Sequence, residues 1–338
     1  MEAVEVGHAA SGRAGGFLAL DWCDGQKTEG LARRSFQLHK GLSEELGADT
    51  GYRAMNTLSL GVQEGRGGGG GTRGPAWVTG EVTHCEVIGT PDTTAQVHPQ
   101  LLTRALAAAA QRRGARLVAG EVAGLRLEAG AVTGVSLSSG ATLAADTVVL
   151  CMGPWTGRGL RWAGVGRELI EGTRAHSITL QLQDPATSTI DNTALFLSSL
   201  RDPEVYPRPD GTVYMCGGCS SDHAPLPPHP RDVVVDTAAC AQIKEAAGAV
   251  SAELGAVTRY TPSACYLPHS EDGAPLIGHL DQVTVTSYHV FCEENPPRLH
   301  SRCRAWWWLP ATSAGASSRA PPPARLWPSS WSMERPRK

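Results

Sequence analysis

The clearest helical pattern in this chain lies in residues 99–113. Its apolar positions fall on one face of a 3.6-residue repeat, at Leu101, Leu102, Ala105, Leu106 and Ala109. Pro99 stands near the start of the stretch, and the basic pair at 112–113 precedes Gly114 at its end. Residues of these types favour a helix start and a helix stop. The pattern therefore predicts a helix over Pro99–Arg113.

Strand-like runs follow this helix. The short ones are Ala115–Ala119, Val122–Glu128 and Val132–Ser136, with a turn at Gly130 between the last two. Thr147–Cys151 is a continuous apolar run that opens into a Gly-Pro turn, as expected of a strand buried on both faces. A helix, short strands and a buried strand that ends in a glycine turn are typical of an α/β nucleotide-binding domain.

Further strand-like segments predict a second sheet, which is antiparallel. They are Thr57–Val62, Ile178–Gln183 and Thr212–Gly217, and turn signals such as Arg-Pro-Asp-Gly at 208–211 separate them. The glycine run Gly65–Gly71 lies in the same region. It lacks the Lys-Ser or Lys-Thr that follows a phosphate loop, so we expect a flexible inserted loop.

Composition adds limits on the function. The chain of 338 residues is long enough for two domains. Its 30 basic residues are scattered and outnumbered by 33 acidic ones, so no nucleic-acid partner is expected. No apolar run is long enough to span a bilayer, and the nine cysteines do not form a disulfide framework. We therefore expect a cytoplasmic protein with reduced thiols.

One cysteine pair, Cys216 and Cys219, has the Cys-x-x-Cys spacing of zinc and redox sites. A structural zinc ion needs four ligands, and no second pair has matching spacing. The pair also lies inside a strand-like segment, whereas reactive cysteines sit at helix starts. We expect structural thiols and no metal.

The glycine-rich segment Ser11–Gly16 carries the strongest candidate chemistry. Its three glycines allow close approach of the backbone to a bulky planar or phosphorylated ligand. Its consecutive N–H groups are donors of the kind that bind phosphate at a helix start. Taken alone, however, such a run favours a structural turn, because glycine-rich turns are common.

Other motifs follow this segment in a fixed order. They are Val-His-Pro at 97–99, Gly-Glu-Val at 120–122 and Val-Val-Leu-Cys-Met-Gly-Pro-Trp at 148–155. The series resembles the FAD-dependent oxidoreductases that include glycine, D-amino acid and sarcosine oxidases. A subgroup found in fungi, plants and algae is most similar, through Ser11–Ala19, Ala32–Phe36, Tyr206–Gly211 and Ala264–Pro268. The resemblance runs from residue 1 to about residue 280.

The resemblance implies an FAD cofactor and a set of residues that hold it. These are Glu2, Ser11, Gly12, Ala14, Gly15, Gly16, Val122, Gly153, Pro154, Trp155, Gly273 and Gly278. Glu2 would accept hydrogen bonds from the ribose, and the glycine segment would line the pyrophosphate and the flavin ring. Val122 would contact the adenine through its backbone. Each residue also has a structural interpretation, as part of a turn or of the core.

The implied reaction is oxidation of the C–N bond of a small amine or amino acid, by hydride transfer to flavin N5. The protein then mainly orients the substrate and fixes its carboxylate, commonly with an arginine. Arg174 and Arg208 are candidates, although most arginines are solvated surface groups. His98 and His176 are expected to be structural.

The expected fold is α/β, with an α+β substrate domain built on the antiparallel sheet. FAD-binding segments are expected at 1–50, 95–165 and 264–282, and substrate-domain segments at 51–94 and 166–263. The family's Gly-x-Gly-x-x-Gly turn would precede Glu2, so the dinucleotide fold is expected to be incomplete.

The C-terminal part departs from the resemblance. The family continues with a buried strand, a Gly-His-Ser-Cys-Trp-Gly-Ile-Leu turn and a helix. This chain has no periodicity in 283–304, then three tryptophans at 306–308 and a Pro/Ser/Arg-rich tail. An adjacent reading frame from Arg304 onward permits the missing family segment. We therefore hypothesise that residues 283 to about 304 translate a retained intron, and we expect 283–338 to be an aberrant or disordered tail.

Two alternatives to an oxidase remain. The subgroup is implicated in endosome-to-Golgi trafficking, which predicts a non-catalytic, endosome-associated adaptor with trafficking partners. The other is an inactive, truncated gene product.

Overall fold

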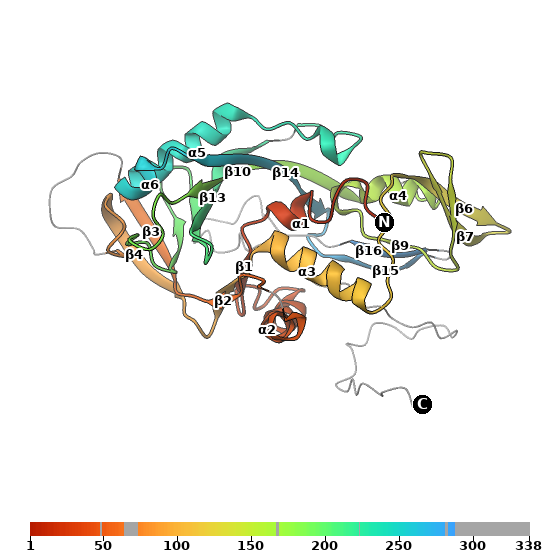
Figure 1. Ribbon diagram of the computed structural model, residues 1–338, viewed down its shortest axis with the longest axis horizontal. Coiled ribbons are helices and arrows are strands. Elements are labelled where there is room, and N and C mark those ends of the chain that lie inside the picture. The colour runs from red at the N-terminus through yellow and green to blue at the C-terminus, as the bar shows by residue number, and fades with distance from the viewer. Residues whose placement is uncertain (48, 64–73, 167–168, 223, 281–282, 288–338) are drawn as a thin grey trace.

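The computed structural model describes residues 1–287, with gaps at 48, 64–73, 167–168, 223 and 281–282. The predicted loop at Gly65–Gly71 and the predicted tail beyond residue 287 lie outside the described residues. Figure 1 shows an elongated molecule in which helices lie on both sides of a long, curved sheet. The fold is mixed α/β, as the sequence predicts.

The long sheet has seven strands in the order β14-β10-β13-β12-β11-β3-β4. Their bounds are Tyr260–Ser270, Ile170–Gln181, Thr212–Asp222, Pro203–Pro207, Ala194–Leu197, Thr57–Gln63 and Glu81–Gly89. Neighbouring strands are antiparallel, apart from the parallel pair of β11 and β3. The three predicted strands of an antiparallel sheet correspond to β3, β10 and β13 and are confirmed, although β10 begins at Ile170 instead of Ile178 and ends at Gln181 instead of Gln183. In the predicted turn, Gly211 has a φ of +77° and its N–H donates to the carbonyl of Arg208.

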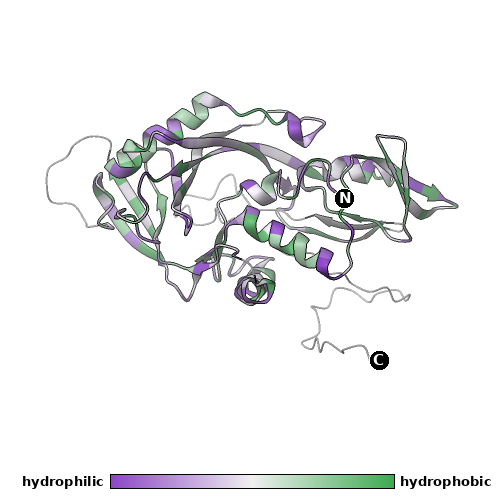
Figure 2. Ribbon diagram, viewed as in Figure 1, coloured by the Kyte–Doolittle hydropathy of each residue, from purple (hydrophilic) through white to green (hydrophobic). Residues whose placement is uncertain are grey.

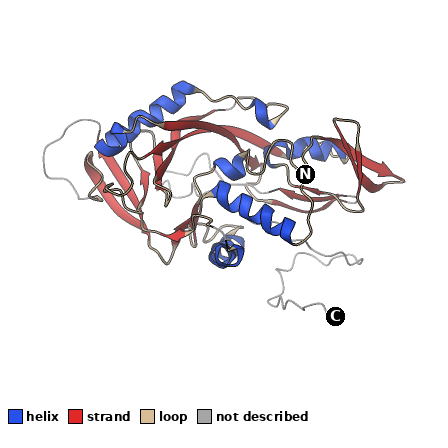
Figure 3. Cartoon of the chain, in the orientation of Figure 1, coloured by secondary structure: helices blue, strands red, loops and turns tan. Residues whose placement is uncertain are grey.

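Two helices cover one face of this sheet. α5 (Thr237–Val250) begins at Asp236, whose carboxylate accepts from two backbone N–H groups of the first turn. α6 (Ala252–Ala256) follows it directly. Their apolar side chains, such as Ile243, Val250 and Leu254, join the largest hydrophobic cluster of the molecule. Figure 3 shows these blue helices along the red strands of the sheet.

A second layer contains α2 (Glu29–Leu46) and α3 (Pro99–Arg112). They pack beside the small sheet β1-β5-β2, formed by Phe17–Ala19, Thr94–Gln96 and Arg53–Ala54. The predicted helix at 99–113 is confirmed, and His98 caps it because its Nδ1 accepts from the N–H of Leu101 at 3.4 Å. In Figure 2, α3 carries both apolar and polar residues, as its amphipathic pattern requires.

The remaining elements form the end of the molecule near the N-terminus (Figure 1). β6 (Val122–Glu128), β7 (Ala131–Leu137) and β8 (Thr142–Ala144) make an antiparallel meander, so the strands predicted at 122–128 and 132–136 are confirmed. The segment 115–119 forms no strand, and only Ala119 pairs, through an isolated bridge with Glu2. β9 (Val149–Leu150) leads into the short helices η1 (Gly153–Trp155) and α4 (Thr156–Trp162).

Two expectations for the sheet β15-β16-β9 are wrong. The run at 147–151 is not buried on both faces, since the Val149 residue is 49% exposed. Leu150, which points to the opposite face of β9, is 4% exposed and packs with Leu160 of α4, so the described residues cover only one face of the strand. Residues 283–287, where no element is predicted, form β16 (Val283–Ser287) against β15 (Leu276–Leu280). Alternating Val and Thr suit a strand, and β-branched residues favour it.

No helix in the described part of the chain is long and apolar enough to cross a membrane. The division into FAD-binding and substrate segments stays a prediction.

Candidate functional site

The glycine segment Ser11–Gly16 begins inside α1 (Ala10–Arg13) and continues beyond its end, and its glycines are packed against the protein itself. A Cβ on Gly12 would collide with the carbonyl oxygen of Gly7. On Gly16, which has a φ of +89°, it would collide with the carbonyl of Val97. On Gly15 it would lie 2.6 Å from Tyr206 Cε2. The sequence suggests that a ligand lies close to the backbone of these three glycines. In the structure, the protein's own atoms lie there instead.

Hydrogen bonds hold this segment between three elements. The Thr103 hydroxyl on α3 donates to the carbonyl of Ser11 at 3.0 Å. The Tyr214 hydroxyl on β13 donates to the carbonyl of Arg13 at 3.1 Å, and Arg13 Nη1 donates to the carbonyl of Ala264 on β14 at 2.7 Å. The bond from Arg13 to Ala264 and the close contact of Gly15 with Tyr206 bring together three of the segments that carry the sequence resemblance, Ser11–Ala19, Tyr206–Gly211 and Ala264–Pro268.

Arg208 lies at the centre of this meeting point. Its Nη2 donates to the carbonyl of Ala14 at 3.2 Å, its Nη1 lies 3.4 Å from His98 Nε2, and its guanidinium stacks 4.9 Å from the ring centroid of Tyr214. Burial lowers the pKa of Arg208 below its ordinary value, and the neighbouring Tyr214 and Asp210 oppose that shift. Its buried Nε has no hydrogen-bond partner among the described residues. Arg208 thus places a cation directly against the glycine segment.

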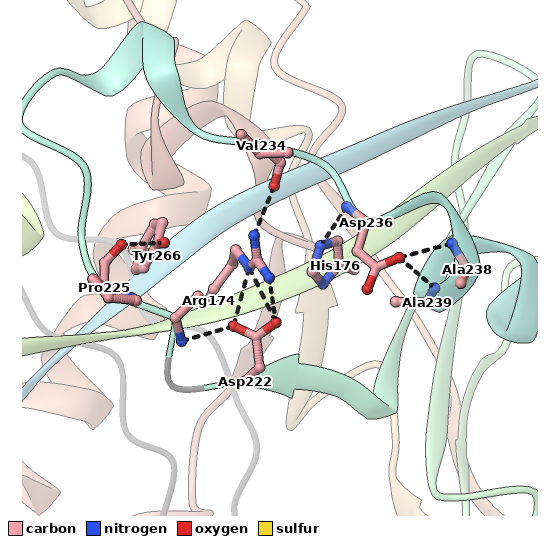
Figure 4. Close-up of polar contacts among 10 residues, drawn as sticks. Arg174, His176, Asp222, Pro225, Val234, Asp236, Ala238, Ala239 and Tyr266 are labelled. Carbon is pink, nitrogen blue, oxygen red and sulfur yellow. Dashed lines mark hydrogen bonds and ion pairs between the residues drawn. The ribbon is translucent and has the colours of Figure 1, made fainter.

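Arg174, the other candidate for a substrate carboxylate, is already paired. Figure 4 shows its guanidinium against Asp222, with Nε donating at 3.0 Å and Nη2 at 2.6 Å. Its Nη1 donates to the carbonyl of Val234. The Arg174 hydrogen bonds hold the pKa of Asp222 below its usual value. A role for Arg174 in substrate binding stays a prediction, and it would require this pair to open.

Glu2 is placed beside the segment that contains Val122. The Glu2 N–H donates to the carbonyl of Val118 at 3.1 Å, and the Gly120 N–H donates to the carbonyl of Glu2 at 2.9 Å. This parallel bridge aligns the first residues of the chain with the approach to β6. Burial by its surroundings raises the pKa of the Glu2 carboxyl. The structure brings together two of the predicted adenosine-binding residues.

Gly153 and Gly278 differ from the glycines of the first segment. Gly153 has a φ of +54°, and no atom of the described residues lies within 4 Å of the position of a Cβ at either glycine. Gly278 on β15 pairs with Val285, which pairs with Leu150, three residues before Gly153. Gly273, with a φ of +66°, turns the chain between β14 and β15. Open backbone at Gly153 and Gly278 fits the close approach of a dinucleotide such as FAD.

Pro154 and Trp155 pack into the fold at the start of α4. Both are buried, and Trp155 Nε1 donates to the carbonyl of Pro227 at 2.7 Å. The Thr156 hydroxyl donates to the carbonyl of Gly153 at 2.7 Å. This end of the glycine turn is therefore fixed by the protein.

A buried acid near the site was missed in the sequence. Glu204 on β12 is 3% exposed and accepts from the Tyr206 hydroxyl at 2.6 Å and the Cys216 thiol at 3.5 Å. Burial, with Glu204 close by, raises the pKa of Tyr206 and of Cys216 well above their ordinary values. One signal in the sequence could have revealed Glu204: an acidic residue inside the otherwise apolar strand Pro-Glu-Val-Tyr-Pro. A charge buried in such a strand needs hydrogen-bond partners, so this residue could have been expected to contact polar side chains.

Cys216 is a free, buried cysteine, and the side chain of Cys219 lies outside what the structure describes. Over the described ranges, no group of three or more His, Cys, Asp or Glu residues could hold a metal ion.

Comparisons with known proteins agree on one family. The family described as FAD dependent oxidoreductase matches residues 1–297. A Schizosaccharomyces pombe protein that is named as an oxidoreductase is 30% identical over 314 residues, covering 82% of this chain and 77% of its own.

Solved structures share the fold at low identity. Glycine oxidase from Geobacillus kaustophilus has a TM-score of 0.69 at 21% identity, covering 85% of this chain and 81% of its own. Iminodiacetate oxidase from Chelativorans sp. BNC1 has a TM-score of 0.66 at 19% identity, covering 82% and 80%. The match along most of the sequence and the shared fold lead to one conclusion: this chain belongs to the FAD-dependent oxidoreductase family.

Proposed function

We propose that this protein oxidises the C–N bond of a small amine or amino acid with FAD as the acceptor. The observation that carries the proposal is the meeting of Ser11–Ala19, Tyr206–Gly211 and Ala264–Pro268 around the backbone of residues 13–15. The family is defined by its use of FAD. Glycine oxidase and iminodiacetate oxidase, which share the fold, are named for an amino acid and for an amine dicarboxylate.

In this proposal the ends of the dinucleotide are held by separate segments. The carboxylate of Glu2 accepts hydrogen bonds from the ribose, and the backbone near Val122 faces the adenine. Residues 11–16 and the open backbone at Gly153 flank the rest of the cofactor. Bound FAD supplies the hydride acceptor for the reaction.

The protein's own groups set the geometry of the site. Arg208 fixes the carbonyl of Ala14 and so holds the turn between α1 and β1. Its positive charge beside that turn favours an anionic group there. The aromatic cluster of Phe17, Trp22, Phe196, Tyr206 and Tyr214 packs behind β1 and excludes water from the region under Gly15.

The visible absorbance of the purified full-length protein, alone and after addition of FAD, tests the cofactor. Anaerobic mixing with a panel of amino acids and secondary amines then tests the reaction, because a substrate bleaches the flavin. Bound flavin that the panel bleaches supports the proposal. Bound flavin that no amine reduces contradicts the amine oxidation, and a protein that stays colourless with added FAD contradicts the cofactor.

A pair of glycine substitutions makes the cofactor test specific. Gly153→Ala introduces a Cβ with a φ of +54° into open space beside the proposed dinucleotide. Gly25→Ala introduces one at a φ of +80°, also into open space, at a surface turn. Both variants carry a similar backbone cost of about 1–2 kcal/mol. Only Gly153→Ala is expected to weaken FAD binding, and equal FAD binding by the two variants would contradict the placement.

A further inference from the structure

The long sheet ends in β4, and no strand lies beside its outer edge in the described part of the chain. β4 pairs with β3 on one side and is the last strand of the sheet on the other. Figure 1 shows it at the end of the molecule opposite the meander of β6, β7 and β8. The edge of a sheet presents backbone N–H and C=O groups that can pair with a strand of another chain. The outer edge of β4 can therefore accept such a strand.

Two features that commonly block such pairing are absent from β4. None of its nine residues is a lysine or a proline. Its register with β3 is regular from His84 to Val87, and the irregularities lie on either side of that stretch. Val87 is apolar and β-branched, and it is 63% exposed. A partner strand would remove part of this apolar surface from water, which stabilises the contact.

The polar side chains of this stretch are complementary to a second copy of the same stretch. His84 and Glu86 are two positions apart, so they lie on one face of the strand. Their Nε2 and Oε2 atoms are 3.8 Å apart, and the two side chains are 53% and 43% exposed. An antiparallel copy that is related by a two-fold axis at Cys85 places His84 of each chain opposite Glu86 of the other. Each dimer then contains two His–Glu pairs, and such directly opposite pairs stabilise a sheet.

Other symmetric registers lose this complementarity. A two-fold axis at His84 places that histidine opposite itself, and an axis at Glu86 places two glutamates directly opposite each other, which is destabilising. An axis between two neighbouring residues would set side chains of opposite faces against each other, which the pleat does not allow. Cys85 is also the central residue of β4, so the strand extends equally on both sides of the axis.

We propose that two copies of this chain associate through β4, with the strands antiparallel and a two-fold axis at Cys85. The two seven-stranded sheets then form one continuous sheet. His84 of each copy lies opposite Glu86 of the other, and Val87 lies opposite Thr83. The contact is isologous, because the same residues meet on both sides. β4 lies outside the segments that are predicted to bind FAD, so the pairing is independent of the proposed function.

Sedimentation equilibrium of the full-length protein at several concentrations tests the pairing, since it measures the dissociation constant of the dimer. We expect a reversible equilibrium between monomer and dimer. His84→Glu places acids opposite each other at both pairs and should raise the dissociation constant at least about tenfold. The double variant His84→Glu with Glu86→Lys restores opposite charges in the same register, and its dissociation constant should return to within about threefold of the wild-type value.

His269→Glu is the matched control for the added charge. His269 Nε2 lies 3.5 Å from Glu171 Oε2, so this variant also adds an acid beside a glutamate, but on β14 at the opposite edge of the same sheet. It should dimerise like the wild type. Thermal melting followed by circular dichroism confirms that each variant is folded. A wild-type protein that is monomeric at every concentration, equal effects of His84→Glu and His269→Glu, or no recovery in the double variant would each overturn the proposal.

Oxidation with copper phenanthroline tests the register, because Cys85 lies opposite itself in the proposed dimer. Residues directly opposite in an antiparallel pair have Cα atoms about 4.5–5.5 Å apart, a separation that a disulfide can span. Cys85 is free in the structure. We expect a disulfide-linked dimer of the wild-type chain and its loss in Cys85→Ser. Equal amounts of linked dimer from the two chains would refute the axis at Cys85.

Discussion

Acidification is expected to destabilise this protein partly through one imidazole, that of His98. Its side chain is 14% exposed, and its Nε2 lies 3.4 Å from Arg208 Nη1 and 3.8 Å from Asp210 Oδ2. Burial, and next the positive charge of Arg208, lower the pKa of His98 from 6.5 to about 4. The ring is therefore neutral in the folded protein at pH 5, while the same ring in the unfolded chain is mostly protonated.

The sign and size of the effect follow from this difference. Between pH 6.5 and 4 the unfolded chain binds the additional proton, so stability falls as the pH falls. With a pKa of 6.5 unfolded and about 4 folded, lowering the pH from 7 to 5 removes about 2 kcal/mol of the free energy of unfolding. The loss approaches about 3 kcal/mol below the folded pKa.

His98→Asn isolates this contribution. Asparagine is a good N-cap residue, so it can still accept from the N–H of Leu101 at the start of α3, but it does not titrate. Urea denaturation followed by circular dichroism at pH 7 and pH 5 gives the free energy of unfolding of both chains. The other titrating groups are common to both chains and cancel in the difference. The wild-type protein should lose about 2 kcal/mol more than the variant over this interval, and an equal loss in both would refute the account of a histidine held neutral by burial and by Arg208.

Two further substitutions test the packing around the glycine segment. Gly16→Ala should lower the free energy of unfolding by about 3 kcal/mol or more, because it combines a φ of +89° with a collision against the carbonyl of Val97. The control Gly30→Ala lies in open space on α2 and should be neutral or stabilising. Similar melting temperatures for the two variants would contradict the predicted collision at Gly16. Tyr206→Phe should cost about 1–3 kcal/mol in urea denaturation, because the buried carboxylate of Glu204 loses a 2.6 Å hydrogen bond; an unchanged midpoint would show that this bond contributes nothing.

Elements that depend on local chemistry could be predicted from the sequence. Helix α3 has its cap, its proline and its apolar face within a few residues, so its position follows from them. β9 was predicted too long and too buried, because a continuous apolar run does not say whether a neighbour lies on each face of a strand. In the described part of the structure, Leu150 packs with Leu160 on one face of this strand, whereas Val149 points to the opposite face and stays exposed.

The candidate site needed the structure for a different reason. Arg208 and Ala14 are 194 positions apart, and Arg174 and Asp222 are 48 positions apart. No local pattern distinguishes an arginine that braces the glycine segment from one that is neutralised by a carboxylate. The sequence could therefore name both arginines as candidates but could not rank them. The structure separates them by their partners.

The glycines show how a motif and a site can differ. A run such as Ser11–Gly16 suggests ligand contact because glycine removes a side chain, yet at Gly15 the space is filled by Tyr206. Any ligand near this segment must approach from the side that the protein leaves open. The packing of Tyr206 alone already requires a glycine at position 15. At Gly153 the reverse holds: no atom of the described residues lies within 4 Å of the position of a Cβ, and only the positive φ of +54° favours glycine there. A substitution at Gly15 should therefore change the stability of the fold, whereas a substitution at Gly153 should change cofactor binding. Gly153, which has fewer protein neighbours, is thus the better position at which to test function.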